Sequence, residues 1–320
     1  MLLGWPLWLG VTLGALLSMI YAFRGGLAAI VRTEFLQFSL MYAGFIVILV
    51  FAVRQFGGWE FLKSNLPSLH LTWHGENSPQ YIFVWYFIAM STLVDPNFYQ
   101  RCYAARSEKV ARNGILISVL FWMFFDFMTT ATGLYAAAIL PNLANPVESY
   151  PQLAVKILPP FARGLFFLAL FATIMSTIDG YAFLSGITIG KDLLGKIWGR
   201  SEDRLVMRFS RLGLIVTFIF AVVLALWLPS VVDIWYGIGT LTTSALLVPL
   251  AASFSENWKM PPRWALFSML TSAAVSGVWM LTGTNEEYWL GLQPIYPGLA
   301  TSVGCFIVSL VFLRDNNGRQ

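Results

Sequence analysis

The hydrophobic residues of this chain gather in long runs that short polar joints separate. Each run has about 20 or more residues, the length that a helix needs to cross the hydrocarbon core of a bilayer. The runs are continuous rather than alternating, which favours helices over the strands of a membrane barrel. The pattern therefore predicts an all-α, polytopic membrane helix bundle with about nine transmembrane helices. We place the runs at residues 3–22, 30–53, 80–98, 114–139, 160–190, 208–228, 232–254, 264–283 and 293–313.

The composition supports lipid as the main partner of the chain. Hydrophobic residues make up 58% of the 320 residues, and charged residues only 11%. A soluble domain averages about 45–50% apolar and about 25% charged residues. We find no linker and no soluble domain, and we therefore expect a single transmembrane domain over residues 1–320.

The basic residues predict the orientation in the membrane. They cluster in every second joint, and cytoplasmic loops of membrane proteins carry an excess of Lys and Arg. The pattern places the N-terminus of this chain outside and its C-terminus in the cytoplasm, as a multi-pass protein of the plasma (inner) membrane. Because topology explains the net charge of +4, we expect no nucleic-acid partner. The basic joints are marked by Arg24 and Arg32, by Arg101 to Arg112, by Lys191 to Arg204, and by Lys259 and Arg263.

Polar residues share one face of the predicted helix over 160–190. Thr173, Ser176, Thr177 and Gly180 follow one another at positions i, i+3, i+4 and i+7, and Asp179 comes three residues after Ser176. Hydroxyl, carbonyl and carboxylate oxygens at membrane depth suit a small cation. Ser and Thr hydroxyls in helices also bond back to carbonyls of their own helix. Both interpretations stay open.

A second acidic residue, Glu34, follows Thr33 at the start of the second predicted span, with Gln37 one turn further on. Polar groups at membrane depth are costly and tend to mark pathways. The alternative is an interfacial carboxylate that reaches the headgroup region near Arg32.

Two further segments carry candidate ligands for a solute. Ser91 and Thr92 precede Pro96, which breaks or ends a helix. Tyr236 and Thr240 lie one turn apart in the span over 232–254. The alternatives are a helix end that reaches water and ordinary packing between helices.

An enzymatic function has little support. His70 and His74 have the spacing of a zinc-binding helix, but Leu71 stands where a metalloprotease has its general base. The sequence shows neither a phosphate-binding glycine loop nor a nucleophile elbow. We expect no enzyme, no catalytic residues and no bound cofactor.

Three segments together resemble the sodium:solute symporter family, whose members have the LeuT-type inverted-repeat fold. Residues 21–37 are similar to the family signature Gly-Gly-Leu-x-Ala-Val-x-x-Thr-Asp-x-x-Gln. Residues 100–112 are similar to its Gln-Arg-x-x-Ala-Ala-Lys-Ser stretch, and residues 174–179 to its Met-Ser-Thr-x-(Asp/Ser) segment. The resemblance covers nearly the whole chain and implies symport of a small organic solute, driven by Na+ as the coupling ion.

The resemblance also implies site residues. The sodium site common to the family would use the hydroxyls of Ser176 and Thr177, the carbonyl of Thr173, and carbonyls of the first core helix. A second sodium, bound by some members, would use Asp179, Gly180 and Glu34. This sequence departs from the family pattern there, because Glu34 replaces an Asp and Gly180 lacks a hydroxyl. Our hypothesis is that Asp179 and Glu34 approach each other, as a second cation site or an exit path.

By the same match the chain begins at the fourth core helix. We therefore expect an incomplete symporter, with a partial LeuT-type architecture and a separate chain as one source of the missing helices. Ser91, Thr92, Tyr236 and Thr240 are our candidate contacts to the small-molecule solute. The alternatives are a symporter-like sensor domain, a proton-coupled carrier and a non-functional fragment.

Overall fold

The computed structural model describes residues 6–197, 203–227, 230–283 and 288–317, and leaves out some side chains, including those of residues 17–29 and 312–317. The described part of the chain consists of helices and loops, without a β-strand. The all-α prediction is confirmed. Contacts divide the chain into two compact units, residues 1–75 with 100–227 (unit 1) and residues 76–99 with 228–320 (unit 2).

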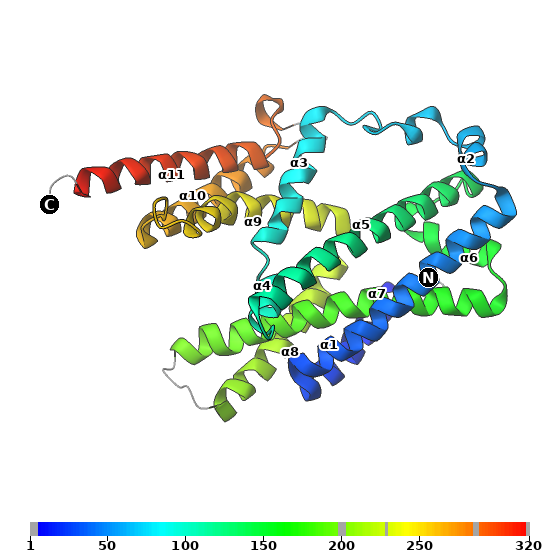
Figure 1. The fold of residues 1–320 in the computed structure, drawn as a ribbon, viewed down its shortest axis with the longest axis horizontal. Coiled ribbons are helices and arrows are strands. Elements are labelled where there is room, and N and C mark those ends of the chain that lie inside the picture. The colour runs from blue at the N-terminus through cyan, green and yellow to red at the C-terminus, as the bar shows by residue number, and fades with distance from the viewer. Residues whose placement is uncertain (1–5, 198–202, 228–229, 284–287, 318–320) are drawn as a thin grey trace. The chain divides into compact units, whose positions relative to one another are not determined.

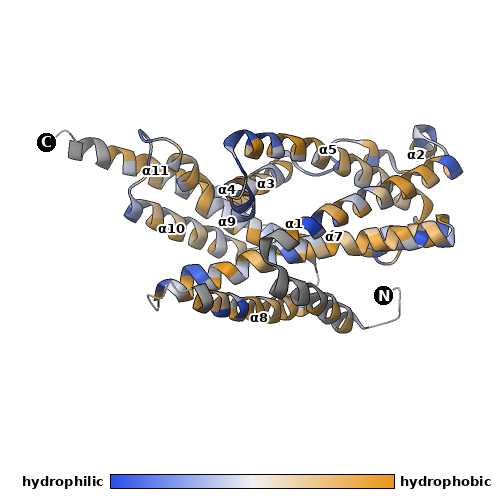
Figure 2. Ribbon diagram, turned by 60° about the horizontal axis from the view of Figure 1, so that its bottom comes forward, coloured by the Kyte–Doolittle hydropathy of each residue, from blue (hydrophilic) through white to orange (hydrophobic). Residues whose placement is uncertain are grey.

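Within the described residues, five helices are long and apolar enough to cross a membrane. Apolar residues predominate along these helices, and polar residues gather at helix ends such as the start of α5 (Figure 2). The predicted bundle of membrane helices is confirmed, whereas the number nine stays a prediction. The five segments are Ile30–Phe56, Glu108–Ile139, Pro160–Gly195, Leu205–Trp227 and Val231–Ser253.

Unit 1 is built around two long helices that run side by side (Figure 1). They are α1 (Leu7–Phe56) and α7 (Pro160–Ile187), and a π-helical segment, Thr188–Gly195, continues α7. Around them pack α5 (Glu108–Ile139), α6 (Ser149–Ile157) and α8 (Asp203–Trp227). The short helices α2 (Trp59–Asn65) and α4 (Pro96–Tyr103) complete the helices of this part of the sequence.

Small residues let α1 and α7 approach closely. A Cβ atom placed on Gly44 would lie 2.3 Å from the Cβ atom of Ala169, so this contact requires glycine. Membrane helices often use small residues at their interfaces in this way. Next to the contact, the rings of Phe45 and Phe166 meet edge to face with centroids 5.3 Å apart. This packing holds the polar residues of α1 against those of α7.

Unit 2 contains α3 (Pro79–Ala89), a 3-10 turn at Met90–Leu93, and the three helices α9 (Val231–Ser253), α10 (Pro262–Met280) and α11 (Ile295–Asn317). The last three pack against one another, and α3 packs against α9. Buried serines join them: Ser276 Oγ lies 3.0 Å from Ser244 Oγ, and Ser268 Oγ lies 3.2 Å from Ser302 Oγ. Hydroxyl pairs of this kind join helices where water is scarce.

Local signals explain several helix boundaries. Ser78 caps α3 by accepting a hydrogen bond from the Tyr81 amide, and Ser107 caps α5 by accepting one from Val110. The expected break at Pro96 is also present, because α3 ends at Ala89 and α4 begins at Pro96.

One predicted joint differs from the structure. We expected residues 23–29 to separate two spans, but the backbone is helical from Leu7 to Phe56. A helix satisfies the backbone groups of every residue in it, and glycine costs only about 1 kcal/mol in a helix interior, so the two glycines there do not end it.

Candidate functional site

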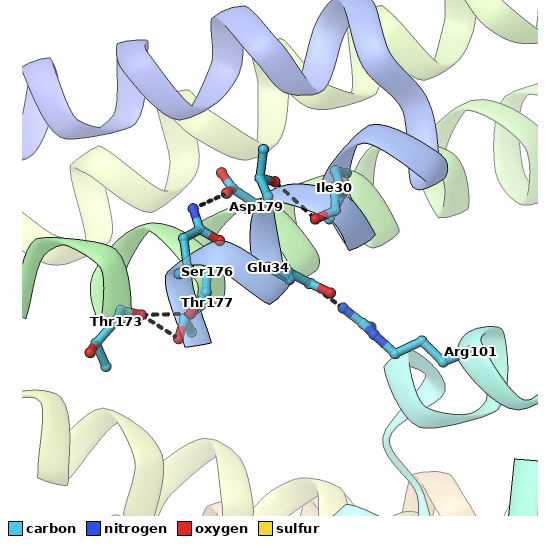
Figure 3. Close-up of polar contacts among 9 residues, drawn as sticks. Ile30, Glu34, Arg101, Thr173, Ser176, Thr177 and Asp179 are labelled. Atoms are coloured by element: carbon cyan, nitrogen blue, oxygen red, sulfur yellow. Dashed lines mark hydrogen bonds and ion pairs between the residues drawn. The ribbon is translucent and has the colours of Figure 1, made fainter. Parts of the chain in front are cut away.

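Three oxygen atoms of α7 come together at the residues that the sequence singled out. Ser176 Oγ donates a hydrogen bond to the Thr173 carbonyl oxygen at 2.9 Å, and Thr177 Oγ1 donates to the same oxygen at 3.2 Å (Figure 3). Thr173 Oγ1 donates to the Ala169 carbonyl at 2.9 Å. The back-bonding that the sequence left open therefore occurs. Each hydroxyl oxygen keeps lone pairs for another partner, so the arrangement can also accept a cation.

The residues that carry these oxygens differ in their exposure. Thr173 and Ser176 are half-buried, whereas Thr177 is exposed within this structure. Asp179 and Gly180, which follow on the same helix, are buried. The hydroxyl pair thus lies at the open side of α7, and the carboxylate of Asp179 lies on the packed side.

Asp179 meets α1 through an amide. Gln37 Nε2 donates a hydrogen bond to Asp179 Oδ2 at 3.3 Å. The other polar atom of this side chain, Gln37 Oε1, is buried and has no hydrogen-bond partner among the described residues. An amide oxygen and a carboxylate are therefore adjacent at the contact between α1 and α7.

Glu34 points to a different partner. Its carboxylate forms an ion pair with the guanidinium of Arg101, from the end of α4 (Figure 3). The Glu34 side chain is 22% exposed and that of Arg101 is 33% exposed, so water screens this pair only in part. The two carboxylates of our hypothesis thus engage different groups, Asp179 with Gln37 and Glu34 with Arg101.

The sequence signals for these contacts are unequal. Glu34 and Gln37 stand three residues apart, so the sequence places them on one helix face. Arg101 stands out in the sequence as a basic residue of a predicted cytoplasmic joint and as part of the Gln-Arg segment that resembles the family. Nothing in the sequence pairs it with Glu34, because 67 residues separate the two and only the fold brings them together.

The solute candidates all belong to unit 2. Ser91 and Thr92 lie in the 3-10 turn that follows α3, and this turn packs against α9. On α9, the Tyr236 hydroxyl donates a hydrogen bond to Gln293 Oε1, and Thr240 is fully buried. The Thr240 hydroxyl has no hydrogen-bond partner among the residues that the structure describes. Unit 2 therefore holds a buried hydroxyl without a hydrogen-bond partner on α9, the helix against which the 3-10 turn packs.

Two curated proteins are similar to this chain over nearly its whole length. The chain is 29% identical over 318 residues to the sodium/pantothenate symporter of Escherichia coli (strain K12), covering 95% of this chain and 64% of that protein. It is 25% identical over 322 residues to the osmoregulated proline transporter OpuE of Bacillus subtilis (strain 168), covering 96% of this chain and 64% of that protein. The chain thus spans less than two thirds of the length of these curated relatives.

The fold also matches a solved structure, that of a Na+-coupled sialic acid symporter in a substrate-bound, outward-open state. The TM-score is 0.73 at 19% sequence identity, over 96% of this chain and 67% of that one. This likeness shows a shared LeuT-type fold. The sequence model of the sodium:solute symporter family matches residues 1–252, which is most of the chain. The chain therefore belongs to the sodium:solute symporter family.

Proposed function

We propose that this chain forms part of a sodium-coupled symporter that moves a small organic solute by alternating access. The observation that carries the proposal is the convergence of the Ser176 and Thr177 hydroxyl oxygens on the carbonyl oxygen of Thr173, at 2.9 and 3.2 Å. A sodium ion prefers such oxygens. Thr173 and Ser176 are half-buried and Thr177 is exposed, so an ion could reach the three oxygens from the open side of α7. Rotation of the two hydroxyls would turn their lone pairs from the protein toward the ion.

The remaining ligands of this sodium site would come from the first core helix, as the family resemblance implies. We further propose that Asp179, Gly180 and Glu34 form a second cation site or an exit path. The burial of Asp179 and the neighbouring Gln37 amide support a polar route along the contact between α1 and α7.

For the solute, we propose a small molecule that carries a carboxylate. Two curated relatives are named for pantothenate and for proline, and both compounds have this group. Ser91, Thr92, Tyr236 and Thr240 are the proposed contacts, since hydroxyl donors can bind a carboxylate. We place the protein in the plasma (inner) membrane with its C-terminus in the cytoplasm, as the distribution of basic residues indicates.

The energetics suit solute accumulation. One charge that moves through about 100 mV releases about 2.3 kcal/mol. A tenfold sodium gradient adds about 1.4 kcal/mol. For a solute without net charge, such as zwitterionic proline, the sum of about 3.7 kcal/mol supports roughly 500-fold accumulation for each sodium ion. An anion such as pantothenate cancels the charge of one sodium ion, so the sodium gradient alone would support about tenfold accumulation.

Because the remaining sodium ligands are assigned to the first core helix, uptake is tested in proteoliposomes that contain the chain together with the core helices that precede this region in the family. With radiolabelled pantothenate and proline as probes, we expect uptake of at least one of them when an inward sodium gradient is imposed. Replacement of sodium by choline should abolish this uptake. Equal uptake in choline, driven by a proton gradient alone, would contradict sodium coupling and indicate a proton-coupled carrier. Unchanged uptake in both Asp179→Ala and Glu34→Ala would remove the second cation site.

A further inference from the structure

The ion pair between Glu34 and Arg101 lies at one end of a series of polar side chains, Glu34, Gln37 and Asp179, which we call the polar path. One turn along α1 from Glu34, the Gln37 amide reaches Asp179 on α7. Asp179 lies three residues from Ser176, whose hydroxyl bonds to the Thr173 carbonyl. Neighbouring side chains of α1 thus contact α4, through Glu34 and Arg101, and α7, through Gln37 and Asp179.

The path contains a buried acceptor that has no donor among the described residues. Asp179 is fully buried, and Gln37 Oε1 is buried without a hydrogen-bond partner among the described residues. A buried acceptor without a donor is costly, and a cation would satisfy it. Glu34 supplies a third acceptor one turn away, but the Arg101 guanidinium already engages it.

We propose that Arg101 is a tethered cation that competes with a mobile monovalent cation for Glu34. While Arg101 is paired with Glu34, the oxygens of Glu34, Gln37 and Asp179 do not jointly bind a mobile cation. When Arg101 withdraws, Glu34 becomes available and the three oxygen groups can bind one. Arg101 would then determine how many cations the protein binds. This inference rests on the proposed function, because it assigns the occupant of the second cation site.

Two properties of the pair favour competition over a purely structural role. Both side chains are partly exposed, so withdrawal of Arg101 from Glu34 would not leave a fully buried charge behind. Arg101 also lies in the last turn of α4, a helix that ends two residues later at Tyr103. The guanidinium therefore sits on a short element, whereas Glu34 belongs to a helix fixed by its packing against α7.

Equilibrium binding of radioactive sodium ions to the purified chain tests the proposal. The Arg101→Gln variant should bind one sodium ion per chain more than the unmodified protein, whatever number the unmodified protein binds. Arg101→Lys retains the charge and should bind the same number as the unmodified protein. The double variant Glu34→Gln with Arg101→Gln should lose the additional ion. Arg101→Met, which is also neutral, provides a second test if the Gln variant fails to fold.

Equal sodium counts in the unmodified protein and in a folded neutral variant would overturn the proposal. An additional ion that persists in the Glu34→Gln background would overturn it as well. These results are separate from a failure of the proposed function. If Ser176 and Thr177 bind no sodium, the unmodified protein will bind fewer sodium ions. The difference in bound sodium between the unmodified protein and the Arg101→Gln variant will stay the same.

Discussion

At the scale of single residues, Tyr236 makes a polar contact with its hydroxyl and a packing contact with its ring, and the two can be tested separately. Its hydroxyl donates to Gln293 Oε1, while its ring lies beside that of Trp85 with centroids 6.1 Å apart. Removal of the hydroxyl leaves the ring in place. This residue therefore allows a test of the proposed solute contact without a large effect on the fold.

We expect Tyr236→Phe to raise the half-saturating concentration of the solute by about five- to tenfold, the effect of about 1 kcal/mol from one hydrogen bond. The half-saturating concentration of sodium should stay unchanged. Solute-dependent and sodium-dependent uptake curves measure both values. Tyr86→Phe on α3 is the matched control, since Tyr86 is 66% exposed. A solute curve that is the same for Tyr236→Phe and the unmodified protein would remove Tyr236 from the solute site.

The residues of the proposed sodium site were predictable only as a set. The spacing of Thr173, Ser176 and Thr177 placed them on one helix face, and the structure shows two of their hydroxyls on one carbonyl. The partners of the acidic residues were not predictable. A sequence does not contain the distance between Glu34 and Arg101, which depends on how α1 and α4 pack.

At the scale of elements, close contacts between helices depend on glycine, which has no side chain. Gly44 on α1 faces Ala169 on α7, and a Cβ atom there would come within 2.3 Å of the Ala169 Cβ atom. We expect Gly44→Ala to destabilise the protein by about 1–3 kcal/mol, because neither backbone can yield without disturbing this contact. Thermal unfolding in detergent measures the change. Gly164→Ala on α7 is the control, since nothing lies within 4 Å of its added Cβ atom. Equal melting temperatures for both variants would contradict this packing.

In unit 2, α11 also has a glycine at a close contact between helices. A Cβ atom on Gly298 would lie 1.9 Å from Ser276 Oγ and 2.7 Å from Ser244 Oγ, so Gly298→Ala should push these two hydroxyls out of position. Their hydrogen bonds would be lost together with the packing, and we expect a loss of about 1–3 kcal/mol in unfolding free energy. Gly304→Ala on the same helix has open space and should be close to neutral. The account of this contact fails if denaturation by urea gives both variants the same stability.

The elements themselves followed from the sequence where local chemistry decides them. Ser78 and Ser107 cap helices as Ser does in general, and Pro96 begins a new one. The sequence could not show that α3 tightens into a 3-10 turn at Met90–Leu93, because packing against α9 contributes there. It also predicted a joint at residues 23–29 where the backbone continues as one helix, since charge alone does not end a helix.

At the scale of the whole molecule, the predicted orientation is open to a direct test. Cysteines introduced at Asn142 and at Ser107 would mark two loops that the basic residues assign to opposite sides of the membrane. After replacement of Cys102 and Cys305 by Ser, a membrane-impermeant thiol reagent added to intact cells should label Asn142→Cys and leave Ser107→Cys unlabelled. Permeabilised cells are the control and should allow both to react. Labelling of Ser107→Cys in intact cells would reverse the assigned orientation.

Family membership could be predicted from the sequence because three short segments occur in the order and spacing of the family. The helical fold could be predicted because apolar runs of membrane length leave few alternatives to helices. The division into two units was not accessible. It depends on which helices contact one another, such as α9 with α10 and α11, and single-sequence patterns do not contain that information.

The central claim is that the hydroxyls of Ser176 and Thr177 make solute binding depend on sodium. The most direct measurement compares the affinity for the solute in sodium and in choline buffer, for the unmodified protein and for the double variant Ser176→Ala with Thr177→Ala. Ser118→Ala on α5 is the control, because the exposed Ser118 hydroxyl also bonds back to a carbonyl of its own helix, that of Gly114 at 2.8 Å. The account predicts at least about tenfold tighter binding in sodium for the unmodified and control proteins, and equal affinities in both buffers for the double variant. Sodium-dependent binding that persists in the double variant would contradict it.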